Sequence, residues 1–349
     1  MKITVNKQKY RFNEGQTILE IAKNNGIYIP TLCWTAKTGP ASRCRICVVE
    51  IDLMPGLQPA CSILATDGMV VVTDSDDVLQ ARRTIVETLL SNGKHDCISC
   101  DATGRCELQD VAYYLGIKEY PIFSEPVIPI DTTSPMIVMD PNKCILCGRC
   151  IKGCNNIVIN EVLTLANRGY ASQVVCDNHR SMGDSGCVQC GECLQLCPTG
   201  ALTEKKALGK GREWELERVN TTCAYCGVGC QLTLHIDRKN NRIIRVSGRD
   251  EVPNRGMLCV KGRFGYEFPH SKKRISHPLI RKGGDLVAVS WDEALDYTAK
   301  KLLDIKQKHG ADAISSIACA RTTTENNYAL MKFTRVVLGT NNIDHCART

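Results

Sequence analysis

The first part of the chain alternates polar and apolar positions and then changes to a helical period. Residues 3–5 and 9–12 alternate, which predicts two strands joined by a tight turn. Thr17 precedes an apolar run over residues 18–23 with helical spacing, and its hydroxyl is suited to cap the first turn. We therefore expect a small unit of mixed α and β structure over residues 1–76.

Later stretches carry further helical and strand periods, separated by a segment rich in proline. Five prolines fall within residues 117–141, which excludes a helix or central strand and predicts an extended linker over residues 119–140. The last residues, 276–349, follow a helix, strand, helix order that begins an α/β domain. The expected helices are 77–90, 291–309 and 325–338, and the expected strands are 232–236, 242–246 and a buried one at 314–319.

Composition directs attention to the cysteines. The chain has 349 residues, of which 43% are apolar, so it is long enough to bury real cores without a disulfide framework. It nevertheless carries 22 cysteines, and clustered cysteines in such a chain indicate metal sites. The sequence shows neither a signal core nor an apolar run of membrane length, so we expect a cytoplasmic protein without membrane insertion.

The first cysteine group follows the predicted strand, strand, helix unit, an order typical of a ferredoxin-type β-grasp. Ten, two and thirteen residues separate its four members. This spacing is wider than the plant-type ferredoxin pattern, and a tetra-thiolate zinc site is the alternative to a [2Fe–2S] cluster. The members are Cys33, Cys44, Cys47 and Cys61.

A second group, within residues 77–118, follows the predicted helix 77–90. Cys97, Cys100 and Cys106 supply three thiolates, and the imidazole of His95 can fill a fourth coordination position. The alternative is that His95 is an exposed side chain at a helix end.

The third group, within residues 141–204, is a repeated run with the spacing of a bacterial ferredoxin that holds two [4Fe–4S] clusters. In that arrangement the fourth cysteine of each run crosses to the other cluster, and zinc is a weaker alternative. The expected ligand sets are Cys144, Cys147, Cys150 and Cys197 for one cluster, and Cys187, Cys190, Cys193 and Cys154 for the other.

A fourth group lies within residues 219–275. Cys223, Cys226 and Cys230 are close in sequence, and the predicted hairpin carries the chain back to Cys259. Taken alone, these residues fit either a fourth [4Fe–4S] cluster or a zinc ribbon. Three further cysteines, Cys176, Cys319 and Cys346, have no partner at ligand spacing and are expected to be packed or free thiols.

The N-terminal groups resemble the iron–sulfur domains of respiratory complex I, NAD-linked hydrogenases and NAD-linked formate dehydrogenases. The run Cys106-Glu-Leu-Gln-Asp matches the stretch that opens the next helix in that family group. In complex I the histidine ligand stands four residues before the first cysteine, where this chain has Gly93. Here His95 stands two before Cys97, which resembles the diaphorase-linked hydrogenase and formate dehydrogenase branch.

The C-terminal part resembles the opening of the molybdenum and tungsten bis-pterin oxidoreductases. The resemblance rests on Cys259-Val-Lys-Gly-Arg-Phe, Pro278-Leu-Ile-Arg-Lys and Ser290-Trp-Asp-Glu-Ala-Leu, and it implies that Lys261 bridges the last cluster and a pterin. The runs Thr324-Glu-Asn-Asn-Tyr and Gly339-Thr-Asn-Asn-Ile-Asp-His-Cys-Ala-Arg resemble formate dehydrogenase catalytic subunits.

This resemblance implies an α+β multidomain protein with one [2Fe–2S] cluster, four [4Fe–4S] clusters and, in the full-length protein, a Mo or W bis-pterin guanine dinucleotide. Formate would be oxidised to CO2, and electrons would pass to an FMN- and NAD-binding iron–sulfur subunit, with a small [2Fe–2S] subunit as a further candidate partner. No dinucleotide fingerprint is present, so nicotinamide chemistry is expected on another subunit. The metal-ligating Sec or Cys is expected just after Thr349, at a UGA codon misread as stop, so that this chain alone would lack formate activity.

Charge and two other functions complete the sequence picture. The formal charge of +7 treats cysteines as neutral, and thiolate-bound clusters would bring it to about −2. Basic runs such as Lys272-Lys273-Arg274 lack interleaved aromatic residues, so no nucleic-acid partner is expected. The alternatives are a non-catalytic electron-transfer subunit of an NAD-linked hydrogenase or complex I-like enzyme and, with less support, a structural zinc protein.

Overall fold

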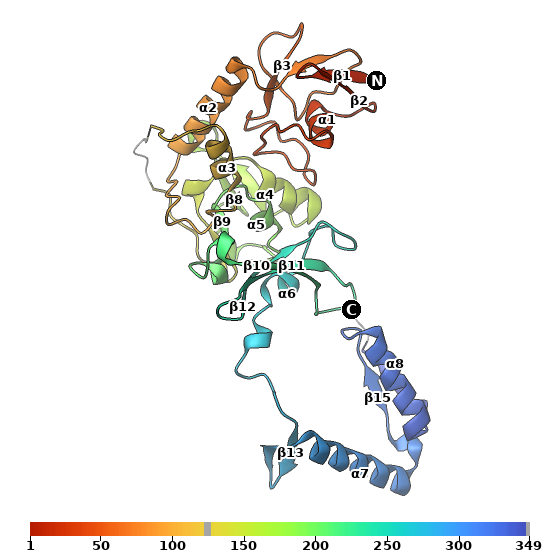
Figure 1. Cartoon of the computed structure of the whole chain (residues 1–349). Coiled ribbons are helices and arrows are strands. Elements are labelled where there is room, and N and C mark those ends of the chain that lie inside the picture. The colour runs from red at the N-terminus through yellow and green to blue at the C-terminus, as the bar shows by residue number, and fades with distance from the viewer. Residues whose placement is uncertain (122–126, 347–349) are drawn as a thin grey trace.

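The computed structural model describes residues 1–121 and 127–346. The chain runs from an N-terminal sheet, through a helical centre and a second sheet, to a C-terminal arm that stands apart from the rest (Figure 1). No helix in these two described ranges is both long and apolar enough to cross a membrane.

The N-terminal unit is a five-stranded sheet with one helix packed on it. The strand order is β2-β1-β5-β3-β4, in which β1 and β2 form the expected antiparallel hairpin and β1 and β5 run parallel. Thr17 caps the start of α1, as the sequence predicts, and Glu20 completes a reciprocal capping box that was not predicted. The elements are β1 (Lys2–Val5), β2 (Gln8–Arg11), α1 (Ile18–Asn24), β3 (Val48–Ile51), β4 (Gln58–Pro59) and β5 (Val70–Val72).

Two helices connect this unit to the centre. Helix α2 (Asp76–Ser91) begins at the cap Ser75 and confirms the helix expected at 77–90. Helix α3 (Glu107–Tyr114) starts directly after Cys106. The buried stripe of α2 contains Arg82 among apolar residues, which the periodicity alone did not predict.

The central unit is built from short helices, a hairpin and a buried pair of strands. Its elements are β6 (Ile137–Met139), α4 (Arg149–Lys152), the π-helical turn η2 (Gly153–Ile157), β7 (Leu163–Ala166), β8 (Gln173–Cys176), α5 (Glu192–Leu196) and β9 (Leu202–Glu204). Strand β6 is fully buried and pairs with β9, so the prediction of an extended linker through residue 140 was wrong at its end. The prolines flank this strand instead of interrupting it. The part of the linker over residues 122–126 lies outside the described residues.

A three-stranded antiparallel sheet follows, made of β10 (Glu217–Thr222), β11 (Gln231–Asp237) and β12 (Arg242–Gly248). The hairpin of β11 and β12 was predicted, whereas β10 was not. Helix α6 (Val260–Phe264) then packs against β12.

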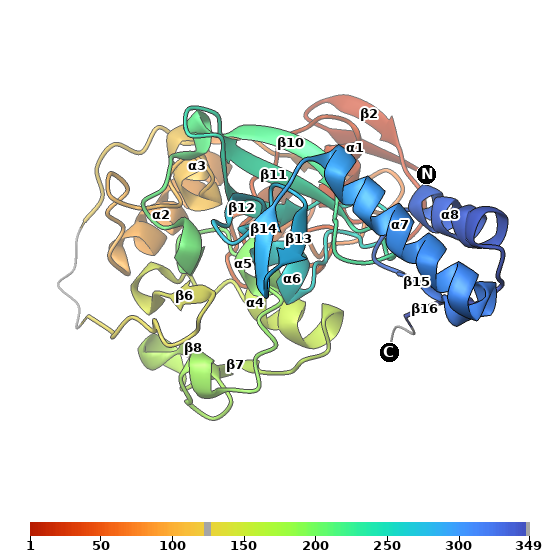
Figure 2. The ribbon, with the colours of Figure 1, turned by 90° about the horizontal axis from the view of Figure 1, so that it is seen from below.

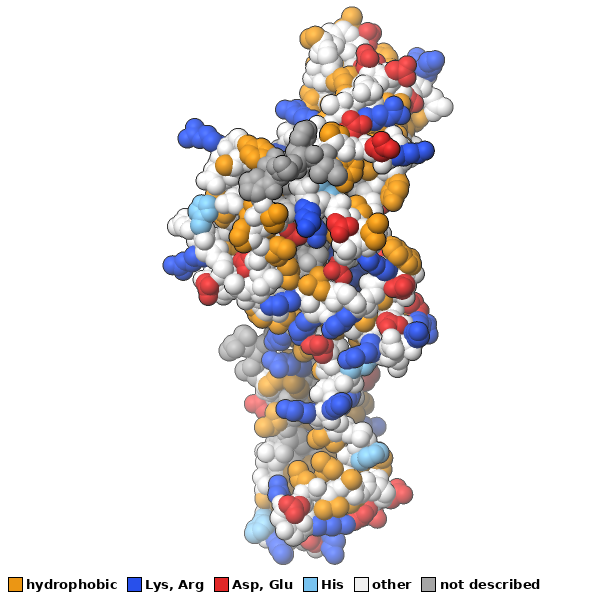
Figure 3. Space-filling view, turned by 90° about the vertical axis from the view of Figure 1, so that its left-hand side faces the viewer, with side chains coloured by type: hydrophobic (Ala, Val, Ile, Leu, Met, Phe, Trp, Pro, Cys, Tyr) orange, Lys and Arg blue, Asp and Glu red, His pale blue; other side chains and the backbone are white. Residues whose placement is uncertain are grey.

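The C-terminal arm holds a hairpin and an α/β unit, and α7 and α8 lie together with β15 at one side of the molecule (Figures 1 and 2). Its elements are β13 (Leu279–Lys282), β14 (Asp285–Ala288), α7 (Trp291–His309), β15 (Ser316–Ala318), α8 (Thr324–Lys332), the π-helical turn η9 (Phe333–Leu338) and β16 (Ile343–His345). The helix, strand, helix order is confirmed. The prediction that the strand is buried was wrong, because Ile317 is 75% exposed. Apolar side chains lie among basic ones on the surface of this arm (Figure 3).

Short 3-10 turns connect these elements. They are η1 (Pro141–Lys143), η3 (Gly169–Ala171), η4 (Met182–Asp184), η5 (Lys205–Ala207), η6 (Glu213–Glu215), η7 (Phe268–His270) and η8 (Ala311–Ala313).

Candidate metal centres

The first cysteine group forms two close thiol pairs. Cys44 Sγ lies 3.4 Å from Cys33 Sγ, and Cys47 forms a hydrogen bond with Cys61. Within each pair the shared proton lowers the pKa of one thiol, to about 5 for Cys33 and about 7 for Cys61, and raises that of the other. Two pairs of thiols are the donor arrangement that two adjacent iron ions need, so these residues fit a [2Fe–2S] cluster.

The loop before β3 also supplies backbone donors. N–H groups of Ala41, Arg43 and Cys44 favour the thiolate of Cys33, and Ser42 and Arg45 have left-handed backbone angles that turn successive amides inward. Such a nest of amides stabilises negative charge on sulfur.

The second group lines one small cavity, which His95 shares with Cys97, Cys100 and Cys106. Atom Nε2 of His95 is buried and has no hydrogen-bond partner among the described residues, while the ring also bonds to the Leu89 carbonyl. Burial lowers the pKa of His95, so the imidazole is neutral and one ring nitrogen carries a free lone pair. A buried orphan nitrogen beside three thiols fits a metal ligand better than the exposed histidine that was the alternative.

A glycine shapes this cavity. A Cβ added at Gly93 would lie 2.3 Å from the Asn142 carbonyl oxygen and 3.2 Å from His95 Nε2. A side chain at position 93 would therefore collide with the Asn142 backbone and crowd the His95 ring.

The repeated runs come together in the crossed manner that the spacing predicts. Cys197 lines one cavity with Cys144, Cys147 and Cys150. The thiol of Cys193 is surrounded by those of Cys190, Cys187 and Cys154. Burial raises the pKa of six of these thiols, most for Cys150 and Cys193, so these six need a metal to exist as thiolates. The other four of the six are Cys144, Cys147, Cys187 and Cys190.

The two runs share one loop geometry. The N–H of Leu146 donates to Cys144 Sγ and that of Gln189 donates to Cys187 Sγ, both at 3.4 Å. Leu146 and Gln189 both have left-handed backbone angles. So do Gly148, which precedes α4, and Gly191, which precedes α5. The same turn thus presents three thiols in each run.

The last group closes through the β11–β12 hairpin. The thiol of Cys230 lies near those of Cys223, Cys226 and Cys259, and the Cys223 N–H donates to the Cys230 carbonyl at 2.8 Å. Lys261 is exposed on α6, two residues after Cys259.

Three cysteines lie outside these groups. Cys176 is buried in the central core, as expected for a packed thiol. Cys319 and Cys346, for which no partner was expected, lie beside each other at the ends of β15 and β16, with their sulfur atoms 3.5 Å apart. Ala347, Arg348 and Thr349 lie outside the described residues.

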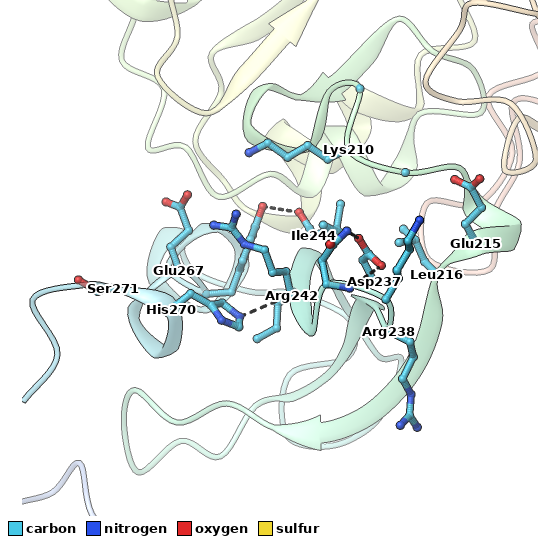
Figure 4. Close-up of a pocket in the computed structure, with 16 residues that line it drawn as sticks. Lys210, Glu215, Leu216, Asp237, Arg238, Arg242, Ile244, Glu267, His270 and Ser271 are labelled. Carbon is cyan, nitrogen blue, oxygen red and sulfur yellow. Dashed lines mark hydrogen bonds between the residues drawn. The ribbon is translucent and has the colours of Figure 1, made fainter. Parts of the chain in front are cut away.

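One large cavity lies away from the cysteine groups. Over residues 1–121 and 127–346, no three His, Cys, Asp or Glu side chains are grouped closely enough to hold a single metal ion. A cavity of about 1220 Å³ lies between the β11–β12 turn and η7, and no cysteine lines it (Figure 4). Its walls mix basic residues such as Arg242 and Lys210 with the acidic Asp237 and Glu267.

Sequence reasoning missed the buried charges around these sites. Arg149, Arg263 and Glu192 are all buried, and no prediction was made for any of them from the sequence. A signal was present, because Arg149 and Glu192 hold the same position within Cys-Gly-X-Cys in the two runs.

Five sequence families match consecutive parts of the chain. They are the 2Fe-2S iron-sulfur cluster binding domain (1–76), the NADH-ubiquinone oxidoreductase-G iron-sulfur binding region (82–121), the ferredoxin-like domain of NADH-quinone oxidoreductase subunit 3 (134–203), the molybdopterin oxidoreductase Fe4S4 domain (216–271) and molybdopterin oxidoreductase (274–349). Among solved structures, a chain of an NAD+-reducing [NiFe]-hydrogenase in the H2-reduced state is 34% identical, with a TM-score of 0.56. The match covers 60% of this chain and 89% of the hydrogenase chain. The chain belongs to the molybdopterin oxidoreductases that carry iron–sulfur domains of the NADH-ubiquinone oxidoreductase type.

Curated relatives of this molybdopterin oxidoreductase chain carry different names. An NADH-quinone oxidoreductase subunit of Rhizobium meliloti is 37% identical over 100% of the chain and 40% of its own length. The NADPH-Fe(3+) oxidoreductase subunit alpha of Geobacter sulfurreducens is 36% identical over the same shares. A protein of Staphylococcus aureus provisionally named a formate dehydrogenase is 31% identical over 99% of the chain and 39% of its own length. The chain therefore spans about two fifths of the length of these relatives.

Proposed function

We propose that this chain is the iron–sulfur relay and N-terminal part of the catalytic subunit of a formate dehydrogenase. Electrons taken from formate would pass through five clusters to a flavin- and NAD-binding partner subunit in the cytoplasm. The proposal rests on iron–sulfur electron transfer joined to a molybdopterin oxidoreductase region, which the matched families establish.

One observation carries the relay: the described residues form five separate thiol-rich sites, which belong to the N-terminal, central and β10–β12 units. These units follow one another in the ribbon of Figure 1. Clusters bound there would accept and release one electron at a time. The chain supplies nineteen thiolates and the neutral imidazole of His95, which is the number of ligands that five four-ligand clusters require.

The geometry supports individual roles in the first cysteine group, and the family resemblance of residues 259–264 supports one for Lys261. Cys33 and Cys44 would hold one iron of the [2Fe–2S] cluster, and Cys47 and Cys61 the other, because the thiols are paired in this way. Lys261, exposed beside Cys259, is the residue proposed to contact the pterin of a Mo or W cofactor.

The second candidate function is an electron-transfer subunit that does not itself oxidise formate. It is favoured by the names of two relatives, an NADH-quinone oxidoreductase subunit and an NADPH-Fe(3+) oxidoreductase subunit. The sequence resemblance of residues 339–348 to formate dehydrogenases supports the first candidate instead.

The test compares electron donors on anaerobically prepared protein. The 349-residue chain is reconstituted with iron and sulfide, and about 18 iron atoms per chain are expected, two from one [2Fe–2S] and four from each of four [4Fe–4S] clusters. Natively purified protein, with its co-purifying subunits, is then mixed with formate, NADH or NADPH, and cluster reduction is followed by EPR. Reduction by formate supports the formate dehydrogenase. Reduction by NADH or NADPH alone favours the second candidate, and zinc without EPR signals contradicts both.

A further inference from the structure

The three largest fully buried side chains in the described part of the chain are all arginines, Arg82, Arg149 and Arg263. Arg149 is the first residue of α4 and lies between Cys147 and Cys150 in the sequence. Its side chain is 2% exposed. An arginine does not lose its proton in a protein, so this position keeps a full positive charge.

The guanidinium of Arg149 joins three of the candidate cluster sites. Its Nη1 and Nη2 donate to the two carboxylate oxygens of Glu107 at 2.6 and 2.7 Å, and Nη2 also donates to the Trp34 carbonyl at 2.8 Å. Glu107 directly follows Cys106, and Trp34 directly follows Cys33. One side chain therefore fixes ligand loops that are 42 and 115 residues from it in sequence.

The charge of Arg149 is only partly balanced by protein groups. The Glu107 side chain is 45% exposed, so water screens much of its charge, and Arg149 Nε is buried without a hydrogen-bond partner in the described ranges. The sulfur atoms of Cys147 and Cys33 are close enough to act on the guanidinium electrostatically. A buried cation needs a nearby anion, and thiolate-bound clusters of net negative charge would be those anions.

The second run of the repeat argues against a purely structural need for arginine here. Glu192 holds the position equivalent to Arg149, after a glycine with the same left-handed backbone. Glu192 is also buried, but it pairs with Lys37 and faces Arg263 Nη2 at 3.7 Å. The loop thus folds with either sign of charge, so the positive charge in the first run is not required by the turn.

We propose that Arg149 is a positioning residue that raises the reduction potentials of two clusters. One is the [2Fe–2S] cluster held by Cys33, Cys44, Cys47 and Cys61, and the other is the [4Fe–4S] cluster held by Cys144, Cys147, Cys150 and Cys197. Reduction adds one electron to a cluster and makes it more negative, and a buried positive charge stabilises that reduced form. The inference rests on the proposed iron–sulfur relay, and it adds that Arg149, shared between loops, sets the potentials of adjacent carriers together.

The experiment is an EPR-monitored redox titration of the reconstituted 349-residue chain. Signals are assigned with Cys44→Ser, Cys147→Ser and Cys226→Ser, one variant for each cluster that is followed. Arg149→Gln is expected to lower both potentials, changing the reduction equilibrium about tenfold, or about 59 mV for one electron. Glu107→Gln removes the partial counter-charge and is expected to raise both reduction potentials. Arg149→Lys keeps the positive charge, so its potentials should stay close to those of the unmodified protein. The signal assigned to Cys223–Cys259 is the internal reference and should not move.

The matched control is Arg238→Gln, which removes the same charge from an exposed ion pair with Glu217. Shifts of the same sign in Arg149→Gln and Glu107→Gln, or no shift in either at full iron content, would overturn the inference. If the Arg149→Gln variant does not assemble clusters, the Glu107→Gln variant alone tests the inference. Unchanged reduction potentials in Glu107→Gln would then reject the inference. Absence of iron–sulfur signals in the unmodified chain is a different failure, because it rejects the proposed relay itself.

Discussion

Arg263 Nε donates a hydrogen bond of 2.8 Å to the carbonyl oxygen of Cys190, although the two residues are 73 positions apart. Arg263 lies on α6, four residues after Cys259, so this bond ties together the ligand loops of two candidate clusters. The close approach depends on Gly191, where an added Cβ would lie 2.1 Å from Arg263 Cδ. The sites of the central unit and of the β10–β12 unit are therefore held in a fixed relation.

We expect Arg263→Gln to destabilise the protein strongly. The guanidinium also bonds to Gln195 at 2.8 Å and faces the buried Glu192, and removing one partner of a buried pair costs about 3–5 kcal/mol. The measurement is the thermal unfolding midpoint of the cluster-loaded chain. Arg238→Gln, which breaks an exposed pair, should cost less than about 1 kcal/mol. Equal midpoints for the two variants would contradict the buried role of Arg263.

His95→Ala should remove or strongly perturb one [4Fe–4S] signal in low-temperature EPR and leave the [2Fe–2S] signal intact. The reason is that the buried, unpartnered Nε2 shares one cavity with Cys97, Cys100 and Cys106 and is placed to be the fourth donor. His95→Cys should restore the cluster at a lower potential, because a thiolate adds negative charge. The control is His270→Ala, which changes a histidine that lines the cavity of Figure 4. Unchanged signals in His95→Ala would show that another group is the ligand.

The crossed ligand sets predict which cysteine variants behave alike. Cys197→Ser should affect the same EPR signal as Cys147→Ser, and Cys154→Ser the same signal as Cys190→Ser. Cys176→Ser is the matched control, because this buried thiol belongs to neither set and should leave both signals unchanged. If Cys197→Ser instead matched Cys190→Ser, each run would hold its own cluster and the crossed assignment would be wrong.

The sequence predicted the grouping of the cysteines well, because metal ligation uses short loops whose spacing is visible in one dimension. The hairpin of β1 and β2, helix α1 and helix α2 were also predictable, since local caps and periods determine them. The buried arginines were not, because their burial comes from contacts between distant segments, such as Arg149 with Trp34. Strand β6 was missed for a related reason: its pairing with β9, over 60 residues later, outweighs the prolines around it.

Glu204 should make stability depend on pH. Its side chain is buried on β9 and accepts a hydrogen bond of 2.5 Å from Tyr266, and burial raises its pKa to about 7. The folded state then binds more protons than the unfolded state between about pH 4.5 and about pH 7, so stability falls as the pH rises through this window. The contribution lost by about pH 8 is at most about 3 kcal/mol.

Glu204→Gln keeps the shape and a hydrogen-bond acceptor but cannot ionise, so this fall should disappear. We expect the thermal unfolding midpoint of the variant to increase relative to that of the unmodified chain as the pH is raised from about 5.5 to about 8. Glu217→Gln is the control, because that carboxylate is on β10 and takes part in an exposed ion pair with Arg238. If the difference in unfolding midpoint between Glu204→Gln and the unmodified chain stays constant over this pH range, Glu204 is already ionised in the folded protein. Its charge would then be balanced by the cations that act on it, which are Arg245, Arg263 and Lys206.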